Sequence, residues 1–211
     1  EIVKPLIERM IKDGIIASDR SPSDEVIYIP NCSSEYFSGY TGQVCTLFDD
    51  IGAQNDPKNL FFDNIIKMKT VGLTYLNQAS LNDPATGQKG DIFVSPIIVS
   101  TANTAHQIHI VKVKYATPGA YYRRRDILVK MIVDDKVMKN GSIDPQTREK
   151  LYSEDLFGHL KFVVVDKTKC EEERFVTGEL NFSQFYQYLT NAYVQYVEDG
   201  LRLKALEKQF V

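Results

Sequence analysis

The residues Val44–Gln54, VCTLFDDIGAQ, join an apolar run directly to two adjacent acids. The run before Asp49 is too short for a helix and follows a turn that contains glycine, so we expect a buried strand. In an open α/β sheet, ligands bind in the crevice beyond the carboxyl ends of the strands. Asp49 and Asp50 are therefore a candidate pair for holding Mg²⁺ and orienting a water molecule.

This acidic pair has two interpretations. It resembles the Walker B arrangement of nucleotide hydrolases, in which carboxylates after a strand hold the metal of a nucleotide. An acidic pair at the end of a strand is also a common solvated turn. The strand and its two acids do not separate these interpretations, and the rest of the sequence is needed.

The composition is that of an ordinary folded protein. The 211 residues include 43% hydrophobic and 25% charged side chains, with a net charge of −3. This charge argues against a chain that coats nucleic acid with its whole surface, while local basic patches remain open. Cys32, Cys45 and Cys170 are widely spaced, so we expect reduced thiols and no zinc. No apolar run approaches the ~18 residues of a membrane span, and nothing at the start resembles a signal peptide.

Strands and helices are expected to alternate. An amphipathic helix over 1–13 ends at Gly14, and a second helix covers 60–71. An Asn181-x-x-Gln184 capping box opens the first of two final helices, and the second, 201–211, is amphipathic. Strands are expected at 26–30, 44–48, 91–101, 108–113, 127–133 and 160–166. The alternation predicts an α/β fold with a largely parallel sheet.

Four landmarks in a fixed order produce a specific resemblance. Residues 28–56, YIPNCSSEYFSGYTGQVCTLFDDIGAQND, contain an aromatic-x-Gly-Tyr-x-x-Gln turn that runs into the acidic strand. Residues 79–103 contain ASL, then KG, and end in VSTAN. RRR, at 123–125, precedes an expected strand. In these features the chain resembles the 2C-like proteins of picornaviruses and picorna-like RNA viruses, which are superfamily 3 helicases and hexameric AAA+ ATPases.

The resemblance implies a role for each residue of the nucleotide site. Asp49 and Asp50 would hold Mg²⁺ through its water molecules and polarise the attacking water. Asn103 would hydrogen-bond that water or the γ-phosphate, and Gln54 would belong to the ATP-binding set. Apart from the resemblance, Asn103 has a plain alternative as a turn residue at the end of a strand.

The resemblance also implies that Arg123 and Arg124 are an arginine-finger pair, which reaches the ATP site of a neighbouring subunit. The alternative is a solvated surface or a patch that binds the RNA backbone. The family usually has an aromatic residue after the two arginines, whereas this chain has Arg125. The register of the pair is therefore open by one residue.

Two further surfaces follow from the resemblance. The loop 77–90 lies where related ring ATPases place a pore loop, so Lys89 would contact RNA. The alternative is that Lys89 is an ordinary surface lysine. The segment NDPATGQ lengthens this loop relative to the family, which puts the pore role in doubt. Leu203, Leu206 and Phe210 would dock the final helix into an adjacent subunit, although such a stripe also fits packing against the chain's own core.

We therefore expect an AAA+ type three-layer α/β sandwich with a small C-terminal helical element. Residues 1–140 would form the ATPase core, and 141–211 a C-terminal subdomain ending in an oligomerisation helix. The sequence contains no Gly-x-x-x-x-Gly-Lys-Ser/Thr motif, the loop that grips phosphates. We expect the sequence to be a fragment that starts just after this Walker A loop, and to bind ATP poorly by itself.

The leading expectation is an ATP-driven RNA helicase or translocase that uses ATP and Mg²⁺. Its partners would be viral RNA, other viral replication proteins and further copies of itself in a ring. This ring is expected to be a hexamer. It would work in the host cytoplasm at replication membranes, meeting the membrane only through regions outside this sequence. One alternative is a non-hydrolytic platform for RNA binding and oligomerisation. Another, an unrelated metal-dependent phosphohydrolase, is disfavoured because nothing supplies a nucleophile or a histidine-rich metal shell.

Overall fold

The computed structural model of the chain describes residues 2–18, 25–31, 33–51, 60–70, 73–77, 90–105, 108–168 and 173–207. The chain forms two compact units, each built from separate stretches of sequence. Unit 1 comprises 1–17, 129–165 and 175–211, and unit 2 comprises 18–128 and 166–174. Residue 140, where a domain boundary was expected, lies inside unit 1. The division into 1–140 and 141–211 stays a prediction.

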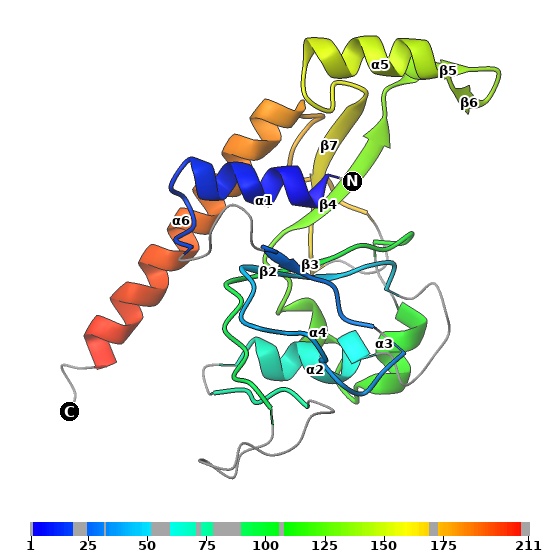
Figure 1. Cartoon of the computed structure of the whole chain (residues 1–211). Helices are drawn as coiled ribbons and strands as arrows, with labels where there is room; N and C mark the ends of the chain where they lie inside the picture. The colour runs from blue at the N-terminus through cyan, green and yellow to red at the C-terminus, as the bar shows by residue number, and fades with distance from the viewer. Residues whose placement is uncertain are drawn as a thin grey trace. The chain divides into compact units, whose positions relative to one another are not determined.

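Unit 2 is built on a parallel sheet with the strand order β1-β2-β3 (Figure 1). The central strand β2 (Cys45–Phe48) pairs on one side with β1 (Ile27–Tyr28) and on the other with β3 (Ile97–Ser100). Cys45 and Phe48 are fully buried, as the apolar run before the acids predicted. The α/β class with a parallel sheet is confirmed, and it is consistent with the AAA+ type of fold.

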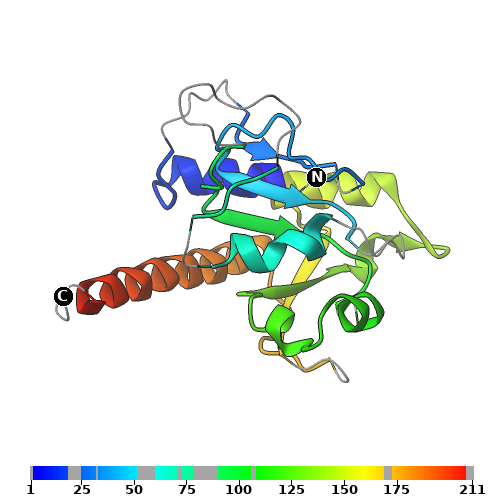
Figure 2. The same ribbon diagram turned by 90° about the horizontal axis from the view of Figure 1, so that it is seen from below.

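Helices cover one face of this sheet. These helices are α2 (Leu60–Met68), α3 (Ile108–Lys114) and α4 (Gly119–Tyr122), which lie beneath the strands in Figure 1; in Figure 2, α2 lies in front of the strands. An aromatic cluster fills the space between the two layers. Phe61 of α2 packs edge-on against Phe48 of the sheet, with ring centroids 5.0 Å apart, and against Tyr121 of α4 at 6.1 Å. Burial of these rings stabilises unit 2.

The segment 108–113 was predicted as a strand, and this prediction was wrong, because it forms α3. Its β-branched residues favour a strand, but Ile110 and Val111 are buried in the aromatic core and Lys114 forms an ion pair with Asp63 of α2. These contacts outweigh a modest difference in intrinsic propensity.

The strand predicted at 91–101 is also shorter than expected, since β3 begins only at Ile97. Pro96 lacks a backbone N–H and cannot donate to a neighbouring strand. The residues before it form a separate short ribbon with 73–77. There Tyr75 forms an antiparallel bridge to Ile92, and the amide of Leu76 donates to the carbonyl of Asp91 at 3.0 Å.

Unit 1 includes the first and the last helix of the described chain and a strand pair. The first helix is α1 (Val3–Lys12), and Gly14 follows it at φ +70°, a conformation that glycine adopts without strain. Strand β4 (Leu128–Val133), which enters unit 1 at Val129, pairs with β7 (Leu160–Val165). Helix α6 (Phe182–Glu207) follows, and α1 crosses it in Figure 1. The helix over 1–13 and the strands at 127–133 and 160–166 are confirmed.

The capping box of α6 forms as predicted. The amide of Gln184 donates to Asn181 Oδ1 at 2.9 Å, and the amide of Asn181 donates to Gln184 Oε1 at 3.0 Å. The prediction of two separate final helices was wrong, because α6 runs through Gly200 as one helix of 26 residues. A glycine inside a helix costs about 1 kcal/mol relative to alanine, too little to end a helix anchored by a cap and a buried face. None of the helices in the described part of the chain is long and apolar enough to span a membrane.

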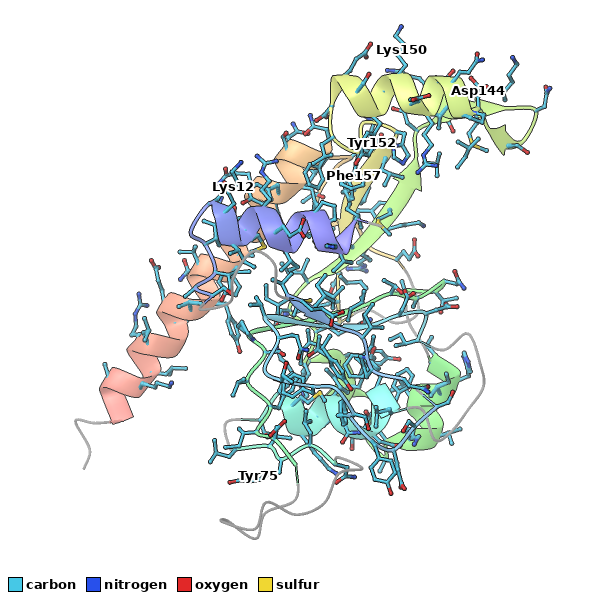
Figure 3. The ribbon with its side chains drawn as sticks, in the orientation of Figure 1. Lys12, Tyr75, Asp144, Lys150, Tyr152 and Phe157 are labelled. Carbon is cyan, nitrogen blue, oxygen red and sulfur yellow. The ribbon has the colours of Figure 1, made fainter. Side chains whose placement is uncertain are left out.

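The sequence analysis missed a small subassembly between β4 and β7. It consists of a 3₁₀ turn (Asp135–Val137), the hairpin of β5 (Met138–Lys139) and β6 (Ser142–Ile143), and helix α5 (Pro145–Glu154). Asp144 caps α5 by accepting from the amide of Thr147 at 3.1 Å (Figure 3). The rings of Tyr152 and Phe157 pack edge to face 5.3 Å apart. Helix α5 has no buried residue, so its sequence shows no apolar stripe from which to predict it.

Candidate active site

The candidate site lies where β2 and β3 end. The register pairs Phe48 with Ser100, so Asp49 and Thr101 leave the sheet together at the same edge. Because the two strands are parallel, both carboxyl ends point to this edge. Both aspartates are exposed, as a site that meets a ligand requires.

Thr101 connects the two strand ends through its hydroxyl. Thr101 Oγ1 donates to Asp49 Oδ1 at 2.5 Å and accepts from the amide of Asp50 at 2.7 Å. Its backbone carbonyl accepts from the amide of Ile51 at 2.8 Å. Sequence reasoning did not single out this threonine. The available signal was its place in VSTAN, directly after the strand that neighbours the acidic one.

Asn103 completes the cluster. Its Nδ2 atom donates to Asp50 Oδ1 at 3.2 Å, so the structure brings Asp49, Asp50 and Asn103 together. Asp50 has φ +49°, in the left-handed region that few residues apart from glycine, asparagine and aspartate adopt. The bonds from Thr101 and Asn103 hold Asp50 in this conformation.

The turn at 39–43 sets the register that makes this cluster. The fully buried hydroxyl of Tyr40 accepts from the amides of Val94 at 2.8 Å and Ser95 at 3.0 Å. Ser95 Oγ in turn donates to the carbonyl of Gln43 at 2.6 Å and lies 3.0 Å from Thr46 Oγ1 of β2. A one-residue slip between β2 and β3 would break these buried bonds, which would cost about 1 to 3 kcal/mol for each group left unsatisfied. The aromatic-x-Gly-Tyr-x-x-Gln turn thus aligns the strands.

The cluster can hold a divalent cation of the magnesium type. Mg²⁺ usually keeps several waters and is bound by one or two carboxylates together with phosphate oxygens. Asp49 and Asp50 match that donor set, and both accept hydrogen bonds that orient their oxygens. Within the described ranges, no group of three or more His, Cys, Asp or Glu residues gathers as a metal site. Asp49 and Asp50 are the two carboxylates described in the cluster.

The arginines follow α4 and precede β4 by a short turn. Arg123 is exposed, and its Nε donates to the carbonyl of Gly119 at 3.2 Å. Arg124 is half-buried, and its Nη1 donates to the carbonyl of Ala120 at 2.7 Å. Both bonds are local, four residues back in the chain. Within the residues that the structure describes, neither arginine is hydrogen-bonded to Asp49 or Asp50.

The remaining predicted site residues are only partly described. Leu203 lies on α6 and is 62% exposed. Leu206 also lies on α6, but its side chain is outside the described residues, as are Gln54, Lys89 and Phe210. Their predicted roles in nucleotide binding, RNA binding and docking stay predictions.

Comparison with known proteins relates the chain to viral polyproteins. Residues 1–104 match the model of the RNA helicase family. The chain is 27% identical over 170 residues, 79% of its length, to the RNA1 polyprotein of Cherry rasp leaf virus. It is 29% identical over 65% of its length to the genome polyprotein of Rice tungro spherical virus, and 28% identical over 60% to that of Avian encephalomyelitis virus. The matched segments make up 7%, 4% and 6% of these polyproteins.

Proposed function

Residues 1–104 belong to the RNA helicase family, of the superfamily 3 type found in picorna-like viruses, and from this premise we propose that the chain is part of an ATP-driven RNA helicase or translocase. It would act in replication of the genome of a positive-strand RNA virus. Because the chain corresponds to a small share of each polyprotein, the activity is proposed for the larger protein that contains it.

The observation that carries this proposal is the meeting of Asp49, Asp50, Thr101 and Asn103 at the ends of two parallel strands. Phosphoryl transfer from ATP to water needs a metal between the phosphates and a water aligned with the γ-phosphorus. Bound Mg²⁺ would neutralise charge on the phosphates. Asp49 and Asp50 would hold it, and Asn103 would orient the water. Thr101 would keep the carboxylate of Asp49 in one orientation.

Arg123 and Arg124 are proposed to act in trans, as an arginine finger for the next subunit of a ring. Three features support this role. Arg123 is exposed, the side-chain hydrogen bonds described for the two arginines go to carbonyls of the preceding α4, and Arg124 Nε is a buried donor without a hydrogen-bond partner among the described residues. Exchanging a weak local bond for a phosphate oxygen costs little, and arginine fingers contribute on the order of 10³ to 10⁵ in rate.

We propose roles for the remaining candidate residues in the same helicase. Gln54 would contact the nucleotide, Lys89 would contact RNA from a pore loop, and Leu203, Leu206 and Phe210 would dock on an adjacent subunit of a hexamer. ATP and Mg²⁺ are the proposed cofactors, and viral RNA and other viral replication proteins the proposed partners. We propose the host cytoplasm, at replication membranes, as the place of action.

The test compares ATP hydrolysis by the 211-residue chain and by a form extended upstream through the expected Walker A loop, at several protein concentrations. We expect hydrolysis by the extended form, with specific activity that rises as subunits assemble. Asp49→Asn should lower the rate by on the order of 10²-fold, because a neutral amide cannot replace a carboxylate at the metal. RNA binding should change little. Glu149→Gln, an exposed acid-to-amide change on α5, is the matched control.

The second candidate is a platform that binds RNA and oligomerises without hydrolysis. The exposed apolar residues along the second half of α6 favour it, since such a surface promotes association. They are Val194, Tyr196, Val197, Leu201 and Leu203. If the extended form assembles and binds RNA but does not hydrolyse ATP, this platform replaces the helicase. Loss of RNA binding in Asp49→Asn with hydrolysis retained would contradict the assignment of the acids.

A further inference from the structure

Arg125 is bound differently from the two arginines before it. Its Nη1 donates to the carbonyl of Ala105 at 2.9 Å, and its Nη2 donates to the carbonyl of Lys167. The guanidinium carbon lies 4.7 Å from the ring centroid of Tyr122 and 5.6 Å from that of Tyr121. One side chain therefore joins three stretches of unit 2 that are far apart in the sequence.

Each end of this connection is firmly held. Tyr121 and Tyr122 are 3% and 6% exposed and belong to the aromatic core. On the other side of Arg125, Asp126 forms an ion pair with Lys69, the residue after α2. Arg123 and Arg124 therefore lie in the chain between two buried tyrosines and the two residues, Arg125 and Asp126, that are bonded to other parts of unit 2. The two arginines therefore extend from an anchored backbone, although the hydrogen bonds described for their own side chains are local.

The connection also reaches the candidate active site. Ala105 is two residues beyond Asn103, whose amide donates to Asp50, and four beyond Thr101, which bonds to both aspartates. The described chain continues without a break from β3 through Ala105. A guanidinium that holds the carbonyl of Ala105 thus restrains the far end of the loop that carries Asn103.

We propose that Arg125 is a positioning residue that ties the Asn103 loop of one ATP site to the arginine pair serving the neighbouring site. The inference rests on the proposed function, in which Asn103 acts within its own subunit and Arg123 and Arg124 act on the next. Through Arg125, a shift of the Asn103 loop when ATP is hydrolysed would move the base of the pair. Adjacent sites in the ring would then be mechanically connected.

Arginine is suited to this task. Its planar guanidinium presents donors in a fixed fork and stacks on aromatic rings, so it can bind two carbonyls and a tyrosine face at once. A lysine at 125 would keep the charge, but its compact ammonium cannot reproduce the fork. We therefore expect Arg125→Lys to fold normally and to retain only part of the positioning.

The first experiment uses the 211-residue chain itself and needs no catalysis. Hydrogen exchange would be followed at the amides of Asp50, Ile51 and Thr101, which bond across the strand ends. We expect about tenfold faster exchange there in Arg125→Gln, because charged hydrogen bonds that hold the loop are lost. Arg125→Lys should show a smaller increase. Arg123→Gln, the matched control, should exchange as the unmodified chain does.

The second experiment separates positioning from a finger role, in the extended form that hydrolyses ATP. Rings mixed from Arg124→Ala and Asp49→Asn subunits should regain activity, because each supplies what the other lacks. Rings mixed from Arg125→Gln and Asp49→Asn should not, because the Arg125→Gln subunit has a displaced Asn103 in its own site. We also expect Arg125→Gln to lower kcat with little change in KM for ATP.

The outcomes are separable. Recovery of the Arg125→Gln mixture to the level of the Arg124→Ala mixture would make Arg125 a finger and overturn the proposal. Unchanged exchange in both Arg125 variants would overturn it as well. If the unmodified extended form does not hydrolyse ATP, the proposed function fails on its own, and faster exchange in the 211-residue chain would still establish Arg125 as the restraint on the Asn103 loop.

Discussion

At the scale of single residues, the candidate site depends on a threonine hydroxyl. Thr101 is half-buried, and its Oγ1 is a donor to Asp49 and an acceptor for Asp50 at the same time. A hydroxyl is the smallest side-chain group that can do both. An acid pair with one such neighbour has a defined orientation, whereas the same pair in a solvated turn would sample many rotamers.

Replacing this hydroxyl tests its role. Thr101→Val keeps the shape of the side chain and removes both bonds, so we expect the free energy of unfolding to fall by about 0.5 to 1.5 kcal/mol. In the extended form, kcat for ATP should fall more than the binding of nucleotide weakens. Thr101→Ser retains the hydroxyl and serves as the control. Urea unfolding and steady-state kinetics measure the two effects, and equal behaviour of the valine and serine variants would contradict the role given to Oγ1.

At the scale of elements, α6 and α3 show when local sequence suffices. Helix α6 begins with two reciprocal bonds between Asn181 and Gln184, which depend only on residues three apart. Helix α3 has no cap of this kind among its described contacts, and its conformation is set by packing against α2. The first could be predicted from the sequence, and the second could not.

The cap of α6 makes a quantitative prediction. Asn181→Ala should lower the free energy of unfolding by about 1 kcal/mol, because the amide of Gln184 loses its acceptor at the helix start. Ser183→Ala, in the same first turn and outside the capping box, should have an effect within about 0.5 kcal/mol. Urea unfolding monitored by circular dichroism would check both. A loss in Ser183→Ala as large as in Asn181→Ala would show that the capping box does not stabilise the helix.

At the scale of the whole molecule, the buried core includes groups that resist ionisation. Burial raises the pKa of Tyr121 from 10.0 to about 12, an effect that nearby Arg125 opposes. Burial likewise raises the pKa of Tyr28 to about 12 and of the Cys45 thiol to about 12. Each of these groups contributes stability that is present in full below the group's pKa in the unfolded chain. This contribution is lost as the pH rises through the group's raised pKa in the folded chain.

Stability should therefore decline at alkaline pH. Between pH values of about 10 and 12 the unfolded chain binds fewer protons than the folded one, so the free energy of unfolding decreases with pH. Tyr121 alone accounts for up to about 1.4 kcal/mol per pH unit in this window. Urea unfolding at about pH 8 and about pH 11 measures the decline, and Tyr121→Phe should make it less steep. Equal stability at the two pH values would contradict the assigned burial effects.

Sequence by itself determined the features that depend on neighbours in the chain. The buried strand and the two acids after it, the capping box of α6 and the glycine that follows α1 are all written in short local patterns, because turns and caps involve residues only a few positions apart. The resemblance of the motifs supplied the family. Local patterns also explain two errors, the start of β3 and the break expected near Gly200 of α6. In both, the pattern did not show how far the strand or the helix extends.

Only the tertiary structure decided the partners of the site. Thr101 meets the acids from 51 and 52 positions away, and Arg125 binds carbonyls 20 and 42 positions away. The pairs that Thr101 makes exist because the parallel register and the buried hydroxyl of Tyr40 hold β2 and β3 in one alignment. Contacts of this separation carry no local signature, since many threonines and arginines occur in similar sequence surroundings. The packed core alone selects which of them meet.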